Sequence, residues 1–403
     1  MPLRRPIVER STTEPHRTAS QLELLFDLTF VIAIARITVE LAHGLASGHV
    51  AESVVPFLEV VFAVWWAWMN FTWFASAYDN DDATFRVLTM LQMAGVLVLA
   101  AGVGPALDHG DFRGITLGYL IMRVGLVTLW LRAAVECPGA RPFALRYAVG
   151  ISALEAAWIL RLVLAERGVI PDGALVPAFV VLVVAELSVP WLAERAAGPG
   201  TSWHPHHIAE RYGLLVIILL GESLLTASTG VRAAVDGGGA GPELVLVAVA
   251  GFVLTMALWW WYFLDDPGEA LVAERQRSFL WGYGHFGVVA ALAALGAGLE
   301  VATEATAGHV AASPLVVAYG VALPVAVFLV VHAAVTGHLF GRSSPVPAAT
   351  SATVAVVLLA PMTAPAVGTA GSVVLVAGAC AVLVWVAGVD RGSSSRRTLH
   401  SPT

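Results

Sequence analysis

The sequence predicts an all-α, polytopic helical membrane protein with about 12 transmembrane helices in two parallel six-helix repeats. Three observations lead to this fold class. Of the 403 residues, 58% are hydrophobic and 13% are charged, whereas roughly a quarter of a soluble protein is charged. The apolar residues form blocks of about 20, the length that crosses a bilayer core. Two motifs also recur about half a chain apart, which indicates an internal repeat.

The predicted spans are apolar on all sides, which favours membrane helices over the amphipathic helices of a soluble bundle. They lie near 21–45, 52–75, 84–106, 112–133, 143–165, 172–193, 207–230, 243–264, 277–300, 313–340, 346–363 and 366–388. We therefore divide the chain into a cytoplasmic tail (1–20), a first repeat (21–195), a linker (196–206), a second repeat (207–390) and a second cytoplasmic tail (391–403).

The basic residues predict the orientation of these spans. All 22 are arginines, and most lie in segments that are cytoplasmic if the first tail is inside. Only Arg113, Arg161, Arg167 and Arg232 lie in the predicted outside segments. Because cytoplasmic loops are enriched in basic residues, we expect a multi-pass plasma-membrane protein with cytoplasmic N- and C-termini.

Two tryptophan-rich stretches occupy equivalent places in the two halves. Residues 65–82 read WWAWMNFTWFASAYDNDD and residues 259–266 read WWWYFLDD, each at a predicted cytoplasmic end of a span. An aromatic belt at the headgroup boundary, followed by solvated acids, is one interpretation. Their recurrence favours the repeat, and six spans per half give both halves the same orientation.

Each tryptophan-rich stretch ends in acids and is followed by arginine. Asp79 lies near the end of the first stretch and precedes Arg86, and Asp265 lies near the end of the second and precedes Arg275 and Arg277. We expect Asp79 with Arg86, and Asp265 with Arg275 or Arg277, to occupy matching cytoplasmic sites. Opposite charges at the ends of adjacent spans can latch helices together and release them during gating.

Two further motifs carry a family resemblance. They are ELLFDLTFVIAIARI (Glu23–Ile37) and HIAERYGLLVIILLGES (His207–Ser223), with the tryptophan-rich second span between them. Over most of its length the chain resembles the bacterial low temperature requirement A family. The resemblance implies a multi-pass membrane protein associated with growth in the cold, and it implies neither a known reaction nor catalytic residues.

Ionisable residues inside predicted spans indicate a functional site, because charge is costly in a bilayer. Glu23 and Asp27 lie four residues apart on one helical face, although two interfacial acids that meet water or a nearby arginine are the alternative. Glu59 and Asn70 share a stripe of the second span, although Asn70 alternatively bonds a neighbouring helix. The predicted substrate or proton pathway comprises Glu23, Asp27, Arg36, Glu59, Asn70, Arg123, Glu210, Arg211, Glu222, His285 and His332, and Glu155 and Glu186 are further ionisable residues within spans.

Arg36 lies in the middle of its span and needs a counter-charge. Aligning the acids that open the two halves, Glu23 and Glu210, places Arg36 level with Ser223 and within one residue of Glu222. We therefore expect the side chains of Arg36 and Glu222 to approach each other. In the alternative, Arg36 pairs with Glu40 one turn away, and Glu222 is satisfied by a hydroxyl such as that of Ser223 or Thr226.

The sequence predicts neither a metal site nor a cofactor. His206, His207 and Glu210 are the candidate ligands, but Pro205 interrupts the run and no cysteine or further acid follows at ligand spacing. We interpret Glu210 instead as an acid that satisfies backbone donors near a helix N-terminus.

These features favour a secondary transporter or ion-coupled permease with a midplane polar site between the two repeats. The alternatives are a membrane-embedded enzyme or lipid-handling protein that supports growth in the cold, and a channel or sensor. The expected partners are the lipid bilayer and a small-molecule or ion substrate, and no basic stretch is built for nucleic acid.

Overall fold

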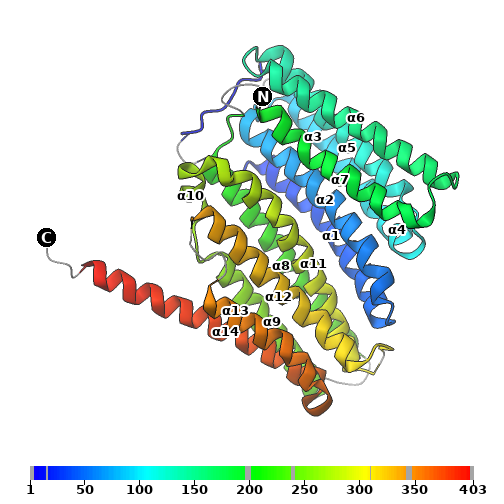
Figure 1. Cartoon of the computed structure of the whole chain (residues 1–403), viewed down its shortest axis with the longest axis vertical. Helices are drawn as coiled ribbons and strands as arrows, with labels where there is room; N and C mark the ends of the chain where they lie inside the picture. The colour runs from blue at the N-terminus through cyan, green and yellow to red at the C-terminus, as the bar shows by residue number, and fades with distance from the viewer. Residues whose placement is uncertain are drawn as a thin grey trace. The chain divides into compact units, whose positions relative to one another are not determined.

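The computed structural model describes residues 4–14, 17–195, 201–236, 241–308, 310–341 and 347–399. Every regular element in these ranges is a helix (Figure 1). The helices are α1 (Gln21–Ala46), α2 (Val50–Tyr78), α3 (Ala83–Ala101), α4 (Val103–His109), α5 (Arg113–Glu136), α6 (Arg141–Glu166), α7 (Asp172–Arg195), α8 (Pro205–Asp236), α9 (Pro242–Tyr262), α10 (Pro267–Ala273), η1 (Arg275–Arg277), α11 (Ser278–Ala305), α12 (Pro314–Leu339), α13 (Ala348–Leu359), η2 (Ala360–Thr363) and α14 (Ala364–Leu399).

Nine helical stretches of the described chain are long and apolar enough to cross a membrane. The helices α1 and α8, which carry Glu23, Asp27 and Arg211, are outside this group. The last two predicted spans form one continuous stretch, Ala348–Val389, and at Gly368 the backbone leaves the helical region with a φ of 73°. The chain is therefore an all-α, multi-pass membrane protein. The count of about 12 spans and the two six-helix repeats remain predictions.

Local hydrogen bonds explain where several helices begin. At the start of α1 the N–H of Ser20 donates to Glu23 Oε2 (2.8 Å), and the N–H of Glu23 donates to Ser20 Oγ (3.3 Å). This reciprocal pair is a capping box. Asp82 caps α3 by accepting the N–H of Phe85 (2.8 Å), and Ser313 caps α12.

The chain divides into two compact units. The first comprises Met1–Ile37 and Val55–Tyr212, and the second comprises Thr38–Val54 and Gly213–Thr403. Their boundaries fall inside α1, α2 and α8. The linker 196–206, of which residues 196–200 lie outside the described ranges, stays a prediction.

In the first unit α3 packs along α5, α5 along α6 and α6 along α7 (Figure 1). The α3–α5 contact depends on glycine. A Cβ atom on Gly118 would lie 2.4 Å from the backbone nitrogen of Leu99, and one on Gly95 would lie 2.7 Å from the Gly118 oxygen. Small residues let two membrane helices approach this closely.

In the second unit α11 packs along α12 and α9 packs along α14. Glycine again sets the closest approach, because a Cβ atom on Gly298 would lie 2.1 Å from the carbonyl oxygen of Gly320. The backbones of α11 and α12 are therefore in direct contact at this point.

Candidate functional site

A buried charge cluster joins α1 to the start of α8 within the first unit. The exposed fractions of Glu23, Asp27 and Arg211 are 0%, 1% and 0%. Arg211 Nη1 donates to Glu23 Oε1 (2.9 Å), while its Nε and Nη2 donate to Asp27 Oδ2 (3.0 Å) and Oδ1 (2.6 Å). Since the two acids are one helical turn apart, both reach one guanidinium from the same face of α1. We call these three residues the Arg211 network.

Further donors surround the Arg211 network. Trp68 Nε1 donates to Asp27 Oδ1 (2.7 Å). His207 Nε2 lies 3.1 Å from Glu23 Oε1, and Arg17 Nη2 lies 4.0 Å from the same oxygen. Two carboxylates are thus accompanied by two guanidinium groups. Such balance matters because an uncompensated buried charge costs several kcal/mol.

The structure brings together Glu23, Asp27 and Arg211, three of the residues in the predicted pathway. The two acids are buried away from water, and both pair with an arginine, which is one form of the alternative interpretation. Sequence reasoning missed Trp68 and Arg17 as their neighbours. One signal was available, because a tryptophan deep in an apolar span needs an acceptor for its N–H.

A second buried cluster lies among α2, α5, α6 and α7 of the same unit. Arg123 Nη2 donates to Glu186 Oε2 (3.3 Å) and to the hydroxyl of Tyr119. Glu186 also accepts the N–H groups of Trp66 (2.8 Å) and Trp158 (3.2 Å). Arg123 and Glu186 are both almost fully buried. We call these five residues the Arg123 network.

The two clusters explain two tryptophans of the first stretch, because Trp66 and Trp68 each donate to a buried acid. Trp65, Trp66 and Trp68 are at most 1% exposed, so the aromatic-belt interpretation is wrong for them. In the second stretch Trp259 and Trp260 are 43% and 58% exposed, as expected for residues at a headgroup boundary.

A small cavity of about 40 Å³ lies beside the Arg123 network. Its polar lining includes Glu59 and Arg161, whose Oε1 and Nη2 atoms are 3.8 Å apart. Tyr119 and Trp158 also line the cavity. Because both residues hydrogen-bond within the Arg123 network, they connect it to the cavity.

The loop after α2 carries the acids of the predicted cytoplasmic latch. Arg86 donates from Nε and Nη2 to Asp81 (2.7 Å each), so the latch predicted between Arg86 and Asp79 is not the observed pair. Asp79 Oδ2 lies 4.0 Å from Arg10 Nη1. Burial, reinforced by the charge of Glu23, raises the pKa of Asp79 to about 6.

Residues 4–14 are held against this end of the first unit. Arg132 donates to Asp82 from Nη1 (2.9 Å) and Nη2 (2.5 Å), and the N–H of Arg5 donates to the same carboxylate (2.9 Å). The N–H of Ile7 donates to Glu136 Oε2 (2.8 Å). Burial opposes ionisation of Asp82, but the hydrogen bonds from Arg132 and Arg5 outweigh this effect and hold the pKa of Asp82 well below its usual range.

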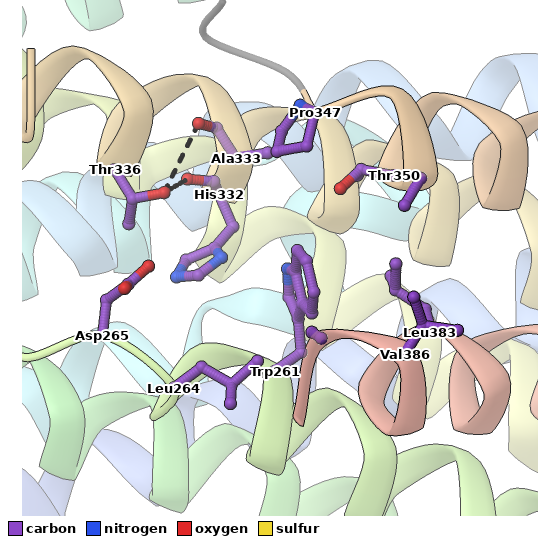
Figure 2. Close-up of a pocket in the computed structure, with 12 residues that line it drawn as sticks. Trp261, Leu264, Asp265, His332, Ala333, Thr336, Pro347, Thr350, Leu383 and Val386 are labelled. Carbon is purple, nitrogen blue, oxygen red and sulfur yellow. Dashed lines mark hydrogen bonds between the residues drawn. The ribbon is translucent and has the colours of Figure 1, made fainter. Parts of the chain in front are cut away.

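A larger pocket of about 230 Å³ lies in the second unit. Its polar lining comes from α9, the loop after it, α12 and α13, and consists of Trp261, Asp265, His332, Thr336 and Thr350. Figure 2 shows the imidazole of His332 and the indole of Trp261 extending from facing helices into the same space, with the Asp265 carboxylate directed toward it. Thus His332 and Asp265 line one pocket. Thr336 donates to the carbonyl oxygen of His332 (2.7 Å).

His285 is a hydrogen-bonded core residue of the second unit. Its Nδ1 lies 2.7 Å from the carbonyl oxygen of Trp281, and its Nε2 lies 3.0 Å from the hydroxyl of Tyr262. Because a carbonyl can only accept, these partners place the proton on Nδ1 and let Nε2 accept from the tyrosine. Both ring nitrogens are therefore engaged.

Two polar side chains have partners other than those expected. Asn70 Nδ2 donates to the carbonyl oxygen of Trp66 (2.7 Å) in its own helix and not in a neighbouring one. Glu210 Oε2 accepts the N–H of Ala19 (3.1 Å). Glu210 therefore satisfies a backbone donor, but this donor precedes α1 and is not at the start of α8.

Two further predicted pairings, Arg36 with Glu222 and Asp265 with Arg275, remain predictions. Arg36 is exposed and belongs to the first unit, whereas Glu222 is buried and belongs to the second, and their approach stays a prediction. So does the pairing of Asp265 with Arg275. Arg277 instead lies 3.5 Å from Glu274 and also donates to carbonyl oxygens at the end of α12.

The candidate metal ligands are not assembled in the described chain. His207 is buried beside Glu23, while His206 is exposed. Among the described residues no three histidine, cysteine or acidic side chains are grouped as a metal site.

Comparison with known proteins supplies the last observation. The model of the bacterial low temperature requirement A protein (LtrA) family matches residues 18–387. The chain is 27% identical over 289 residues to an uncharacterized protein, RA0937, of Rhizobium meliloti (strain 1021). This match covers 67% of the chain and 66% of that protein, so the chain spans just under two thirds of its relative's length. No solved structure matches the chain.

Proposed function

This chain belongs to the bacterial low temperature requirement A (LtrA) protein family, and we propose that it is a secondary transporter or ion-coupled permease. The observation that carries the proposal is the Arg211 network, two carboxylates and a guanidinium buried together in an apolar helical protein. Ionisable groups are retained inside membrane proteins chiefly where an ion, a proton or a charged substrate passes. The polar midplane site predicted from the sequence is part of this proposal.

The geometry gives the network a way to respond to charge. Arg211 is shared by Glu23 and Asp27, so a proton on either acid, or a charged substrate that competes for the guanidinium, would break part of the network. The acids are on α1 and the arginine is at the start of α8. Charge binding would therefore change how firmly these two segments are joined, which is the coupling that a transporter needs.

Glycine contacts support the proposed parallel repeat. One packed helix pair of the first unit, α3 with α5, corresponds to the third and fourth predicted spans. In the second unit, the packed pair α11 with α12 corresponds to the ninth and tenth predicted spans. In each pair a glycine allows direct backbone contact, at Gly118 and at Gly298.

The predicted location is the plasma membrane with both termini in the cytoplasm, and the arginine distribution supports it. A membrane-embedded enzyme, a lipid-handling protein, and a channel or sensor remain the alternatives.

The test is solute-dependent proton movement in proteoliposomes. The vesicles contain the purified full chain and a pH-sensitive dye, and a panel of amino acids, sugars, organic acids and inorganic ions is added with and without a pH gradient. We expect at least one solute to move protons in the wild type and not in Arg211→Gln. Arg113→Gln is the control, because Arg113 forms an exposed pair with Glu166. Absence of any response, together with altered lipid composition in a deletion strain, would favour the enzyme.

A further inference from the structure

Glu155, in the middle of α6, has an unusual environment for a carboxyl group. Its exposed fraction is 4%. Neither of its carboxylate oxygens accepts a hydrogen bond from any described residue. By contrast, Glu186 accepts three, from Trp66, Trp158 and Arg123. A buried ionised carboxylate requires several donors, and a protonated one does not.

The groups that face Glu155 come from the two helices packed against α6. They are Tyr119 and Arg123 on α5 and Glu186 on α7, and the charges of Arg123 and Glu186 act on Glu155. Arg123 commits Nη2 to Glu186, while its Nε and Nη1 have no hydrogen-bond partner among the described residues. The guanidinium therefore has donors that can serve a second acid.

The group formed by Glu155, Glu186 and Arg123 differs from the Arg211 network in its charge balance. In the Arg211 network, Arg17 supplies a second cation for two acids. Around Glu155, two acids share the single cation of Arg123, so full ionisation would leave one uncompensated negative charge in a buried site. One bound proton makes the cluster neutral, and neutrality is strongly favoured where water is excluded.

We propose that Glu155 is a proton-binding residue, which holds one exchangeable proton while Arg123 is paired with Glu186. Binding adds one proton from water to a carboxylate oxygen. Its release returns the proton to water and leaves a carboxylate that accepts Nη1–H or Nε–H from Arg123, drawing the guanidinium away from Glu186.

The neighbouring cavity offers water a place close to this site. A volume of about 40 Å³ is enough for water, since about 10–15 Å³ accommodates one molecule. Tyr119 and Trp158 line the cavity and hydrogen-bond within the Arg123 network, and Glu59 adds a carboxylate that can pass a proton. The inference rests on the proposed function, because it names Glu155 as the residue that binds the coupled proton.

The experiment reads protonation directly. Infrared difference spectra of the reconstituted full chain are recorded across pH, in water and in deuterium oxide. We expect a protonated-carboxyl band that grows as the pH falls, shifts in deuterium oxide and is lost in Glu155→Gln. The control Glu166→Gln, which alters a half-exposed acid at the end of the same helix, should keep the band. If Glu155→Gln does not fold, Glu155→Asp serves instead and should retain the band at an altered midpoint. A spectrum that neither Glu155 variant changes, or a band that does not follow pH, overturns the proposal.

Uptake measurements distinguish this inference from the proposed function. Glu155→Gln mimics the protonated state, so we expect it to keep solute exchange at equal pH and to lose uptake driven by a pH gradient. Proton-coupled uptake with no Glu155 band would refute only the proton site. A Glu155 band without transport of any solute would refute only the transporter.

Discussion

Trp66 and Trp68, two residues apart on α2, donate their indole N–H groups to two different buried carboxylates. Trp66 Nε1 lies 2.8 Å from Glu186 Oε2, and Trp68 Nε1 lies 2.7 Å from Asp27 Oδ1. Residues two apart on an α-helix are separated by a rotation of about 200° around the helix axis. The two clusters therefore lie on opposite sides of α2 at nearly the same level, and a rotation of α2 would strain both hydrogen bonds at once.

The first prediction concerns these indole donors. Trp68→Phe replaces the indole by a smaller aromatic ring and removes the N–H that serves Asp27. We expect it to destabilise the protein by about 1.5–3 kcal/mol, the range for a hydrogen bond to a charged group. Thermal unfolding of the detergent-solubilised protein measures this. The control is Trp260→Phe, an exposed position where a change within about 0.5 kcal/mol is expected. Equal unfolding temperatures for the two variants would show that the Trp68 bond contributes nothing.

The second prediction concerns the shared guanidinium. Arg211→Gln leaves the carboxylates of Glu23 and Asp27 buried with too little positive charge. We expect a loss of about 3–5 kcal/mol, as for other broken buried pairs. The double variant Arg211→Gln with Asp27→Asn removes one of the two negative charges and should recover part of the loss. If the double variant is as unstable as the sum of the two single variants, then the electrostatic explanation is wrong.

Part of this architecture could be read from the sequence, because it depends on local pattern. Apolar blocks as long as a bilayer is thick predict helices wherever they occur. The shared face of Glu23 and Asp27 follows from their four-residue spacing. The spacing does not predict which residue pairs with both acids, because Arg211 lies 184 residues beyond Asp27 and is one arginine among many.

The tryptophans show a second limit of prediction from the sequence. An indole is equally suited to a headgroup boundary and to a buried hydrogen bond with a carboxylate. Composition therefore could not separate Trp66, which is buried, from Trp260, which is exposed. Nor could spacing show that Arg86 turns to Asp81 and not to Asp79, because the conformation of the loop decides this pairing.

The third prediction concerns helix contact in the second unit. A Cβ atom at Gly298 would lie 2.1 Å from the carbonyl oxygen of Gly320, and backbone cannot move aside as a side chain can. We expect Gly298→Ala to force α11 and α12 apart and to cost about 1–3 kcal/mol, as overpacking commonly does. Gly378→Ala is the control, since a Cβ atom there meets open space. Indistinguishable unfolding temperatures would show that the contact is looser than described.

The fourth prediction concerns the pH dependence that Asp79 imparts. Burial and the charge of Glu23 raise the pKa of Asp79 from 3.8 to about 6. The folded chain thus binds this proton more tightly than the unfolded chain. The contribution of this proton to the free energy of unfolding is fully present below about pH 4 and is lost as the pH rises through about 6. Over this window we expect the free energy of unfolding to fall by about 3 kcal/mol, since one pKa unit corresponds to about 1.4 kcal/mol.

The variant Asp79→Asn isolates this contribution. Asparagine stays neutral at every pH and keeps an oxygen that can accept the N–H of Asp81, as Asp79 Oδ1 does now (2.9 Å). We therefore expect the variant to lose the decline in unfolding temperature between pH 4 and 6, and to be more stable than the wild type at pH 7. Asp82 acts in the opposite sense, because its lowered pKa makes stability fall only in more acidic solution. Asp108→Asn, at an exposed position in α4, should retain the wild-type profile. A decline in Asp79→Asn as steep as that of the wild type would assign the pH dependence to other groups.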